Sequence, residues 1–164
     1  MSDTAEIPEA QAQEAQAQEA QTPQLSMQRV FLKDISFESP RSPMIFQEEW
    51  KPEVGLELNT KSRQVGENVY EVVLEITVTV KNNGNTGYLV QVQQGGLFVI
   101  SGLDDQQLHH ALGAFCPATI FPYARENIDA IVVKGSFPAI MLAPINFDAL
   151  YIESLQKQQA ETTQ

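Results

Sequence analysis

The feature that most constrains the fold is a regular alternation of apolar and polar residues between Val69 and Val80. The odd positions include Glu71, Glu75 and Thr77, and the even positions are all apolar: Tyr70, Val72, Leu74, Ile76, Val78 and Val80. A period of two is the spacing at which successive side chains of a β-strand point to opposite faces. The stretch therefore predicts a long strand with one buried face and one face in water.

A β-hairpin is predicted to begin with this strand. Residues 81–87 are rich in Asn and Gly, which tolerate the positive φ of turns. A second alternating run begins at Tyr88, so the two runs predict a hairpin with a loop of several residues. Gly95 and Gly96 interrupt the second strand before residues 97–100, which indicates a bulge or a close approach of another backbone.

Two further strands are predicted upstream, at residues 28–38 and around residues 54–58. Proline and serine at residues 40–43 end the first of them. We expect one face of that strand to carry Val30, Leu32, Asp34, Ser36 and Glu38, and the other to carry Phe31, Ile35 and Phe37. The chain thus has about four antiparallel strands in sequence order.

The pattern changes to helical spacing after Gly102. Asp104 or Asp105 can cap a short helix that runs to Phe115. Apolar residues at helical spacing predict a longer helix over residues 117–134, and Asn146 can cap a last one. Four strands followed by helices predict an α+β fold, with a four-stranded antiparallel sheet and helices on one face.

The charge balance excludes several classes of partner. Acids outnumber bases by 21 to 10, and residues 1–25 contribute five of the acids and no Lys or Arg. An acidic chain lacks the clustered cations that bind nucleic acid or anionic lipid. Residues 1–25, rich in Gln and Ala, are expected to be a disordered acidic tail, and residues 158–164 a frayed C-terminal tail.

Catalytic and metal-binding patterns are not found in the sequence. It has no phosphate-binding loop, no nucleophile elbow and no His-Glu-x-x-His motif. Cys116 has no basic neighbour, and His109 and His110 are adjacent, so on a helix they diverge. We therefore expect no enzyme, no cofactor and no metal.

The location is also constrained by the sequence. The N-terminus lacks the basic segment followed by an apolar segment that a secretory signal would have. No apolar run reaches the ~20 residues that a membrane-spanning helix needs. We expect a soluble cytoplasmic protein without direct membrane insertion.

Aromatic residues in irregular segments are the most informative remaining signal. Phe46, Trp50, Phe121, Tyr123 and Phe137 have fewer regular neighbours to cover them than aromatic residues of strands and helices. A groove lined by such side chains could take an extended apolar peptide without recognising its sequence.

Several blocks of the sequence resemble one protein family. They are Phe31-x-Lys33-Asp34-Ile35-Ser36-Phe37-Glu38-x-Pro40, Trp50-x-Pro52-Glu53-Val54, Val92-Gln93-Gln94-Gly95-Gly96-x-Phe98 and Phe121-Pro122-Tyr123-Ala124-Arg125-Glu126. Residues 69–74 and 142–151 add two more. The chain resembles the SecB family of protein-export chaperones, and the match runs in one register from about Gln28 to Leu155. We expect the family domain at residues 26–157.

The resemblance implies a homotetramer built as a dimer of dimers. It also implies an ATP-independent chaperone that holds unfolded precursor proteins and delivers them to SecA, the translocation motor. The apolar peptide-binding groove of the family would comprise Trp50, Leu56, Leu58, Phe98, Phe121, Tyr123 and Phe137.

The resemblance also implies a SecA-binding patch on the exposed face of the sheet. Asp34, Glu38 and Leu89 match its positions, and Gln91 stands where relatives can carry an acid, so this chain lacks one charge there. The strand alternation independently places Asp34 and Glu38 on one face.

Two other functions remain open. A small-molecule-binding α+β protein or enzyme would have an enclosed pocket with converging polar groups. A chaperone that serves a toxin–antitoxin pair is the second alternative, because some relatives of the fold have that role.

Overall fold

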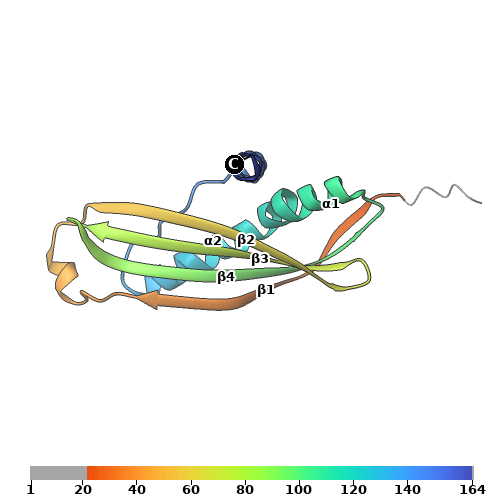
Figure 1. Ribbon diagram of the computed structural model, residues 1–164. Coiled ribbons are helices and arrows are strands. Elements are labelled where there is room, and N and C mark those ends of the chain that lie inside the picture. The colour runs from red at the N-terminus through yellow and green to blue at the C-terminus, as the bar shows by residue number, and fades with distance from the viewer. Residues whose placement is uncertain (1–21, 164) are drawn as a thin grey trace, which may run out of the picture.

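The structure, a computed structural model, describes residues 22–163 as a four-stranded antiparallel sheet with helices on one face (Figure 1). The strands are β1 (Gln24–Glu38), β2 (Pro52–Gly66), β3 (Val69–Asn82) and β4 (Asn85–Ser101), with a short 3-10 helix η2 (Met44–Gln47) between β1 and β2. The helices are α1 (Asp105–His110), η3 (Ala111–Phe115), α2 (Cys116–Lys134) and α3 (Phe147–Thr162). The predicted α+β class is confirmed.

The inner boundaries of both expected tails overlap elements of the structure. Residues 1–21 of the predicted acidic tail lie outside the described residues, and its last part, Gln24 and Leu25, already belongs to β1. At the other end α3 continues to Thr162, through residues that were expected to be frayed.

The order of the strands across the sheet is β1-β4-β3-β2, so the expected sequence order is wrong. The hairpins β2–β3 and β3–β4 pair as neighbours in sequence, as predicted. β1 instead pairs with the distant β4, with Glu38 opposite Leu89 and Gln24 opposite Ser101. β1 and β2 are therefore the two edges of the sheet.

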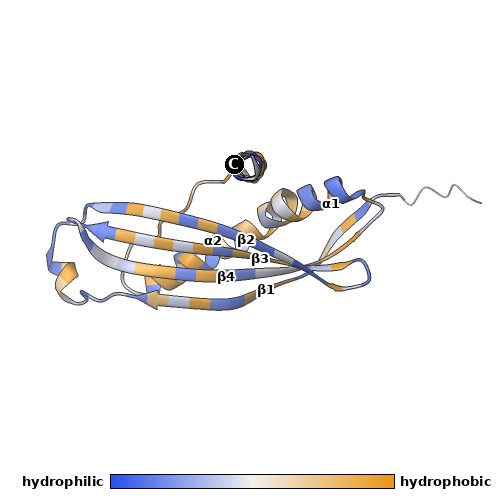
Figure 2. Ribbon diagram, viewed as in Figure 1, coloured by the Kyte–Doolittle hydropathy of each residue, from blue (hydrophilic) through white to orange (hydrophobic). Residues whose placement is uncertain are grey.

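The alternation along β3 and β4 builds the core as predicted (Figure 2). The even residues from 72 to 80 and from 88 to 100 face the helices and are almost fully buried, among them Val72, Leu74, Ile76, Val78, Val90 and Val92. α2 covers them with a stripe of buried residues at helical spacing: Ile120, Ala124, Ile128 and Val132.

The predicted faces of β1 are partly wrong, because the strand is irregular at two places. Its pairing with β4 shifts between Met27 and Arg29 and again between Leu32 and Asp34. Each extra residue reverses which side chains face the core. Val30 therefore packs against the core together with Ile35 and Phe37, whereas Asp34 and Glu38 remain exposed.

The two predicted helices after Gly102 are one continuous helical segment. α1, η3 and α2 follow one another without a break, and the middle turn, η3, is a π-helix. Asp104 caps the start with its side chain, which accepts a hydrogen bond from the Gln107 N–H at 2.7 Å. Gly113 in η3 lets the Tyr151 ring of α3 approach closely, since a Cβ there would lie 2.7 Å from Tyr151 Cδ2.

The helical layer does not cover the whole sheet. α2 packs mainly against β4, β3 and β1, while β2 meets this layer chiefly at η3. α3, seen end-on in Figure 1, packs against η3. The helix-facing apolar residues of β2 are consequently left accessible: Val54 is 49% exposed and Leu56 40%.

Candidate functional site

An aromatic cluster lies at one end of the uncovered face. The ring of Phe137 lies 4.7 Å from Tyr88 and 5.3 Å from both Trp50 and Phe46, measured between centroids. Phe37 completes the cluster at 5.8 Å from Tyr88. The rings of Tyr88 and Phe137 are buried, whereas Phe46 is 49% exposed and Trp50 half-buried, so these two outer rings offer apolar surface to a ligand.

A row of apolar side chains leads away from this cluster along β2. Val54, Leu56 and Leu58 pair with Val80, Val78 and Ile76 of β3, and all of them point to the helix side of the sheet. Trp50 precedes the row and lies over Tyr88 on that same side. The two outer rings of the cluster, Phe46 and Trp50, and this row thus form a single apolar strip.

The far end of this strip opens into a cleft between β2 and the helices η3 and α3. The cleft has a volume of about 620 Å³, and its apolar lining includes Leu56, Leu58, Leu112, Phe147, Leu150 and Tyr151. Leu150 and Tyr151 lie on the apolar side of the last predicted helix. The sequence therefore identified them as apolar helix residues, but it did not show that they face β2.

The structure separates the seven predicted groove residues into two groups. Trp50, Leu56, Leu58 and Tyr123 reach the surface, and the first three lie on the strip. Phe98, Phe121 and Phe137 are buried, Phe98 completely. Val54 was not among the predicted residues, although its alternation with Leu56 and Leu58 could have identified it.

Three of the predicted groove residues have other surroundings. Phe98 packs in the core, close to Gly96 and to Ile120 of α2, because its even position in β4 faces the helices. Phe121 packs against Phe147 with the ring centroids 5.8 Å apart. Tyr123 is exposed on α2.

The opposite, outer face of the sheet carries the four residues predicted for the acidic patch. Asp34, Glu38 and Gln91 are exposed there, and Leu89 is half-buried opposite Glu38. Across β4 and β3, Gln91 and Thr77 lie in the same row as Glu57 of β2. The sequence did not identify Glu57 as a neighbour, because this row depends on the registers of two strand pairs, β3–β4 and β2–β3.

Ion pairs occupy the middle of the outer face. Glu71 accepts hydrogen bonds from Arg63 at 2.7 Å and from Lys33 at 3.1 Å, so these cations cover its carboxylate. The hydrogen bond from Arg63, with that from Lys33, lowers the pKa of Glu71 below its usual 4.5. Glu75 is held in the same way, and the hydrogen bond from Lys61 at 2.8 Å lowers its pKa.

The groups considered for catalysis have structural surroundings. Burial raises the pKa of the Cys116 thiol to about 12, which keeps it protonated at neutral pH. His109 Nδ1 lies 2.6 Å from the Tyr151 hydroxyl, and His110 Nε2 lies 2.8 Å from Asp148, so both imidazoles bind α3. Within residues 22–163, no three His, Cys, Asp or Glu side chains come together as a metal site requires.

Comparison with known proteins identifies the family. The model of the family "Preprotein translocase subunit SecB" matches residues 18–158. The chain belongs to the SecB family. A protein of Marinomonas sp. (strain MWYL1) named protein-export protein SecB is 94% identical over the full length of both chains. One of the same name from Marinobacter nauticus is 57% identical over 85% of this chain and 84% of its own length.

The fold comparison agrees with this membership. A Mycobacterium tuberculosis SecB-like chaperone, solved in complex with a ChAD peptide from the HigA1 antitoxin, superimposes with a TM-score of 0.63. The match covers 74% of this chain and 90% of that one at 15% identity, so it supports the fold. Together with the close SecB relatives, these findings make the chain a protein-export chaperone.

No helix among the described residues is both long and apolar enough to cross a membrane.

The lowered pKa of Glu71 predicts a pH-dependent contribution to stability. A carboxylate with a lowered pKa stabilises the folded state above its unfolded pKa, near 4.5, and loses this effect as the pH falls through the folded value. Glu71→Gln should therefore lower the free energy of unfolding by about 1 kcal/mol at pH 7, and by progressively less below pH ~4.5. Urea unfolding at a series of pH values measures this difference.

Glu67→Gln, at an exposed position in the β2–β3 turn, is the matched control and should change stability little at any pH. A Glu71→Gln difference that stays constant from pH 7 to pH 3 would contradict the assignment.

Proposed function

We propose that this chain holds unfolded precursor proteins, its clients, along the apolar strip formed by Phe46, Trp50, Val54, Leu56 and Leu58. The observation that carries the proposal is that the helical layer leaves the helix-side face of β2 uncovered. An extended client can bury its own side chains there, and the half-buried rings supply contact area at low conformational cost. Tyr123, exposed on α2, is a candidate for a separate contact.

The binding needs no ATP, because removal of apolar surface from water supplies the free energy at about 25 cal/mol per Å². A folded protein offers few extended apolar segments, so the strip does not bind it. The strip recognises apolar surface and backbone rather than a defined sequence, which suits a chaperone of many clients.

A homotetramer, built as a dimer of dimers, would present several such strips to one client. Linked contacts raise the overall affinity because each later contact forms at a high effective concentration. The formal charge of −11 for each chain limits further association and favours neutral or basic clients. Because precursors are collected before export, the proposed location is the cytoplasm.

A patch of exposed acids on the outer face would receive the motor SecA. Asp34, Glu38 and Leu89, with Gln91 beside them, form its centre, and Glu57 extends the same surface through the register of β2. Exposed charges of one sign steer a basic partner and speed its association. The client and the motor would thus bind opposite faces of one sheet, so the motor can bind before the client leaves.

The export function is favoured over the two alternatives. The chaperone solved with an antitoxin peptide shares 15% identity with this chain, whereas a protein-export relative shares 94%. The cleft beside β2 is lined by several exposed side chains of α3, including Leu150 and Lys157, as an accessible groove would be.

Removing apolar surface from the strip should weaken client binding. The double variant Val54→Ser/Leu56→Ser is expected to raise the dissociation constant for an unfolded precursor about tenfold, because two contacts of the strip are lost. It should fold normally, since both side chains are already exposed. Suppression of precursor aggregation without nucleotide, followed by light scattering, measures the loss.

Val65→Ser/Ile152→Ser is the matched control, because both residues are exposed and apolar but neither lines the cleft. Wild-type holding by the strip variant would refute the proposed groove, and failure of the wild-type protein to hold any precursor would refute the chaperone function.

Charge changes on the outer face should alter SecA binding and leave client binding unchanged. Asp34→Ala/Glu38→Ala is expected to weaken SecA binding about threefold to tenfold, because exposed charge pairs are each worth only about 0.2–1 kcal/mol. Gln91→Glu should strengthen it by restoring an acid beside Leu89. Binding of SecA at low and moderate salt measures both effects.

Glu67→Ala/Glu161→Ala changes the net charge equally at exposed positions away from the patch and serves as the control. Client holding should be unchanged in every one of these variants. Equal SecA affinity of wild type and Asp34→Ala/Glu38→Ala would contradict the patch.

A further inference from the structure

The loop between β1 and β2, residues 39–51, supplies the two outer rings of the aromatic cluster, Phe46 and Trp50. Phe46 and Trp50 each lie 5.3 Å from the Phe137 ring, on its outer side. The position of the loop therefore determines whether these rings extend the apolar row of β2 or turn away from it.

The backbone hydrogen bonds of this loop are local. Ile45 N–H donates to the Arg41 carbonyl, and Glu48 N–H donates to the Ile45 carbonyl, so they shape η2 without joining it to the sheet. Two contacts anchor the early part of the loop: Ile45 is buried next to Gly87, and the Ser39 hydroxyl donates weakly to the Gly87 carbonyl at 3.4 Å. The backbone on both sides of Trp50 is joined to the sheet by hydrogen bonds to a side chain of β3.

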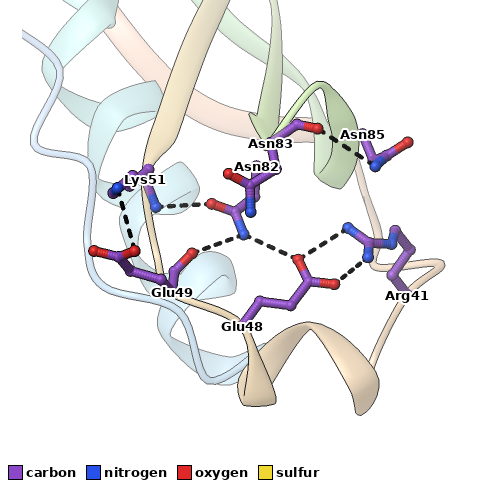
Figure 3. Close-up of polar contacts among 7 residues, drawn as sticks. All are labelled: Arg41, Glu48, Glu49, Lys51, Asn82, Asn83 and Asn85. Atoms are coloured by element: carbon purple, nitrogen blue, oxygen red, sulfur yellow. Dashed lines mark hydrogen bonds and ion pairs between the residues drawn. The ribbon is translucent and has the colours of Figure 1, made fainter.

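That connection is Asn82, the last residue of β3 (Figure 3). Its Oδ1 accepts a hydrogen bond from the Lys51 N–H at 2.7 Å, and its Nδ2 donates to the Glu49 carbonyl at 3.1 Å. These two backbone groups belong to the residues immediately before and after Trp50. One side chain therefore fixes the backbone on both sides of the tryptophan.

The same amide is part of a larger network. Asn82 Nδ2 also donates to Glu48 Oε2 at 3.2 Å, and the Glu48 carboxylate in turn accepts both guanidinium hydrogen bonds from Arg41 (Figure 3). Asn82 is completely buried. Its hydrogen-bonding groups are all used there, as buried polar groups require.

Asparagine is chemically suited to this position. The side chain must present an acceptor to one backbone N–H and a donor to a backbone carbonyl, and a short amide does both. An alanine would leave the N–H of Lys51 and the carbonyl of Glu49 without these partners. An aspartate would accept from Lys51 but would repel the Glu48 carboxylate and the Glu49 carbonyl.

We propose that Asn82 is a positioning residue for client binding, which acts by fixing the backbone around Trp50 so that its ring continues the apolar strip. Asn82 itself lies beneath the surface and does not touch the client. This inference rests on the proposed function of the strip, and the two are separated by the experiment below.

Trp50 is the one tryptophan of the chain, so its fluorescence reports the position of this ring directly. Asn82→Ala should shift the emission to longer wavelength and increase quenching by acrylamide. The dissociation constant for reduced and alkylated α-lactalbumin, a permanently unfolded client, should rise about fivefold to tenfold, because less of the protein has the competent loop conformation.

Asn85→Ala is the matched control. Asn85 lies in the same β3–β4 hairpin and is exposed, and within residues 22–163 its side-chain amide hydrogen-bonds only to the Asn83 carbonyl, at 3.5 Å. Its removal should change neither the fluorescence nor the affinity.

A second pair of variants, in which the charge moves from residue 48 to residue 82, separates an effect on the position of Trp50 from an effect on stability. It also tests the inference if Asn82→Ala does not fold. Asn82→Asp should weaken client binding at least as much as the alanine variant. Adding Glu48→Gln should restore part of the affinity and of the Trp50 emission, because the new amide can donate to the aspartate and still accept from Arg41. Recovery of both readouts supports the inference.

Two results would overturn the inference: unchanged Trp50 emission in the Asn82 variants, or a loss of affinity that follows thermal stability rather than emission. The groove itself is tested separately by Trp50→Ala. Unchanged affinity in that variant would count against the proposed function, whatever the Asn82 variants do.

Discussion

The structure depends on a mismatch in width between a four-stranded sheet and the helical layer that covers it. β3 and β4 bury their even residues under α2, and this contact forms the core. β2 continues the same apolar alternation beyond the helix, so Val54 and Leu56 face the helical side without being covered. A sheet normally buries such a face. Here the uncovered part becomes an apolar strip that continues from a buried core.

The two faces of the sheet have separate chemistry because strand side chains alternate. On the helix side β2 contributes Leu56 and Leu58, and on the outer side it contributes Glu57 from the position between them. One strand would thus supply both the apolar contacts proposed for the client and charge on the surface proposed for the motor. Substitutions on one face are therefore expected to leave the other intact, so the two proposed activities should be separable by substitution.

The sequence predicted the local parts of the fold better than the distant ones. The β3–β4 hairpin and the cap at Asp104 follow from neighbouring residues, and both are confirmed. The pairing of β1 with β4 depends on residues far apart in sequence, and the irregularities near Gln28 and Lys33 reverse the faces of β1 without a clear signal. For the site, Leu56 and Leu58 lie on the strip, whereas the even position of Phe98 already indicated the core. Asn82 could not be identified, because its role depends on a loop more than 30 residues earlier in the chain.

The most direct test of the account asks which face of the sheet touches an unfolded precursor. A photo-crosslinking residue placed at Leu56 should form adducts with a bound precursor, and the same residue at Gln91 should not. With SecA present, the Gln91 position should crosslink to SecA while the Leu56 position still crosslinks to the precursor. Crosslinking of the precursor at Gln91, with none at Leu56, would contradict the account.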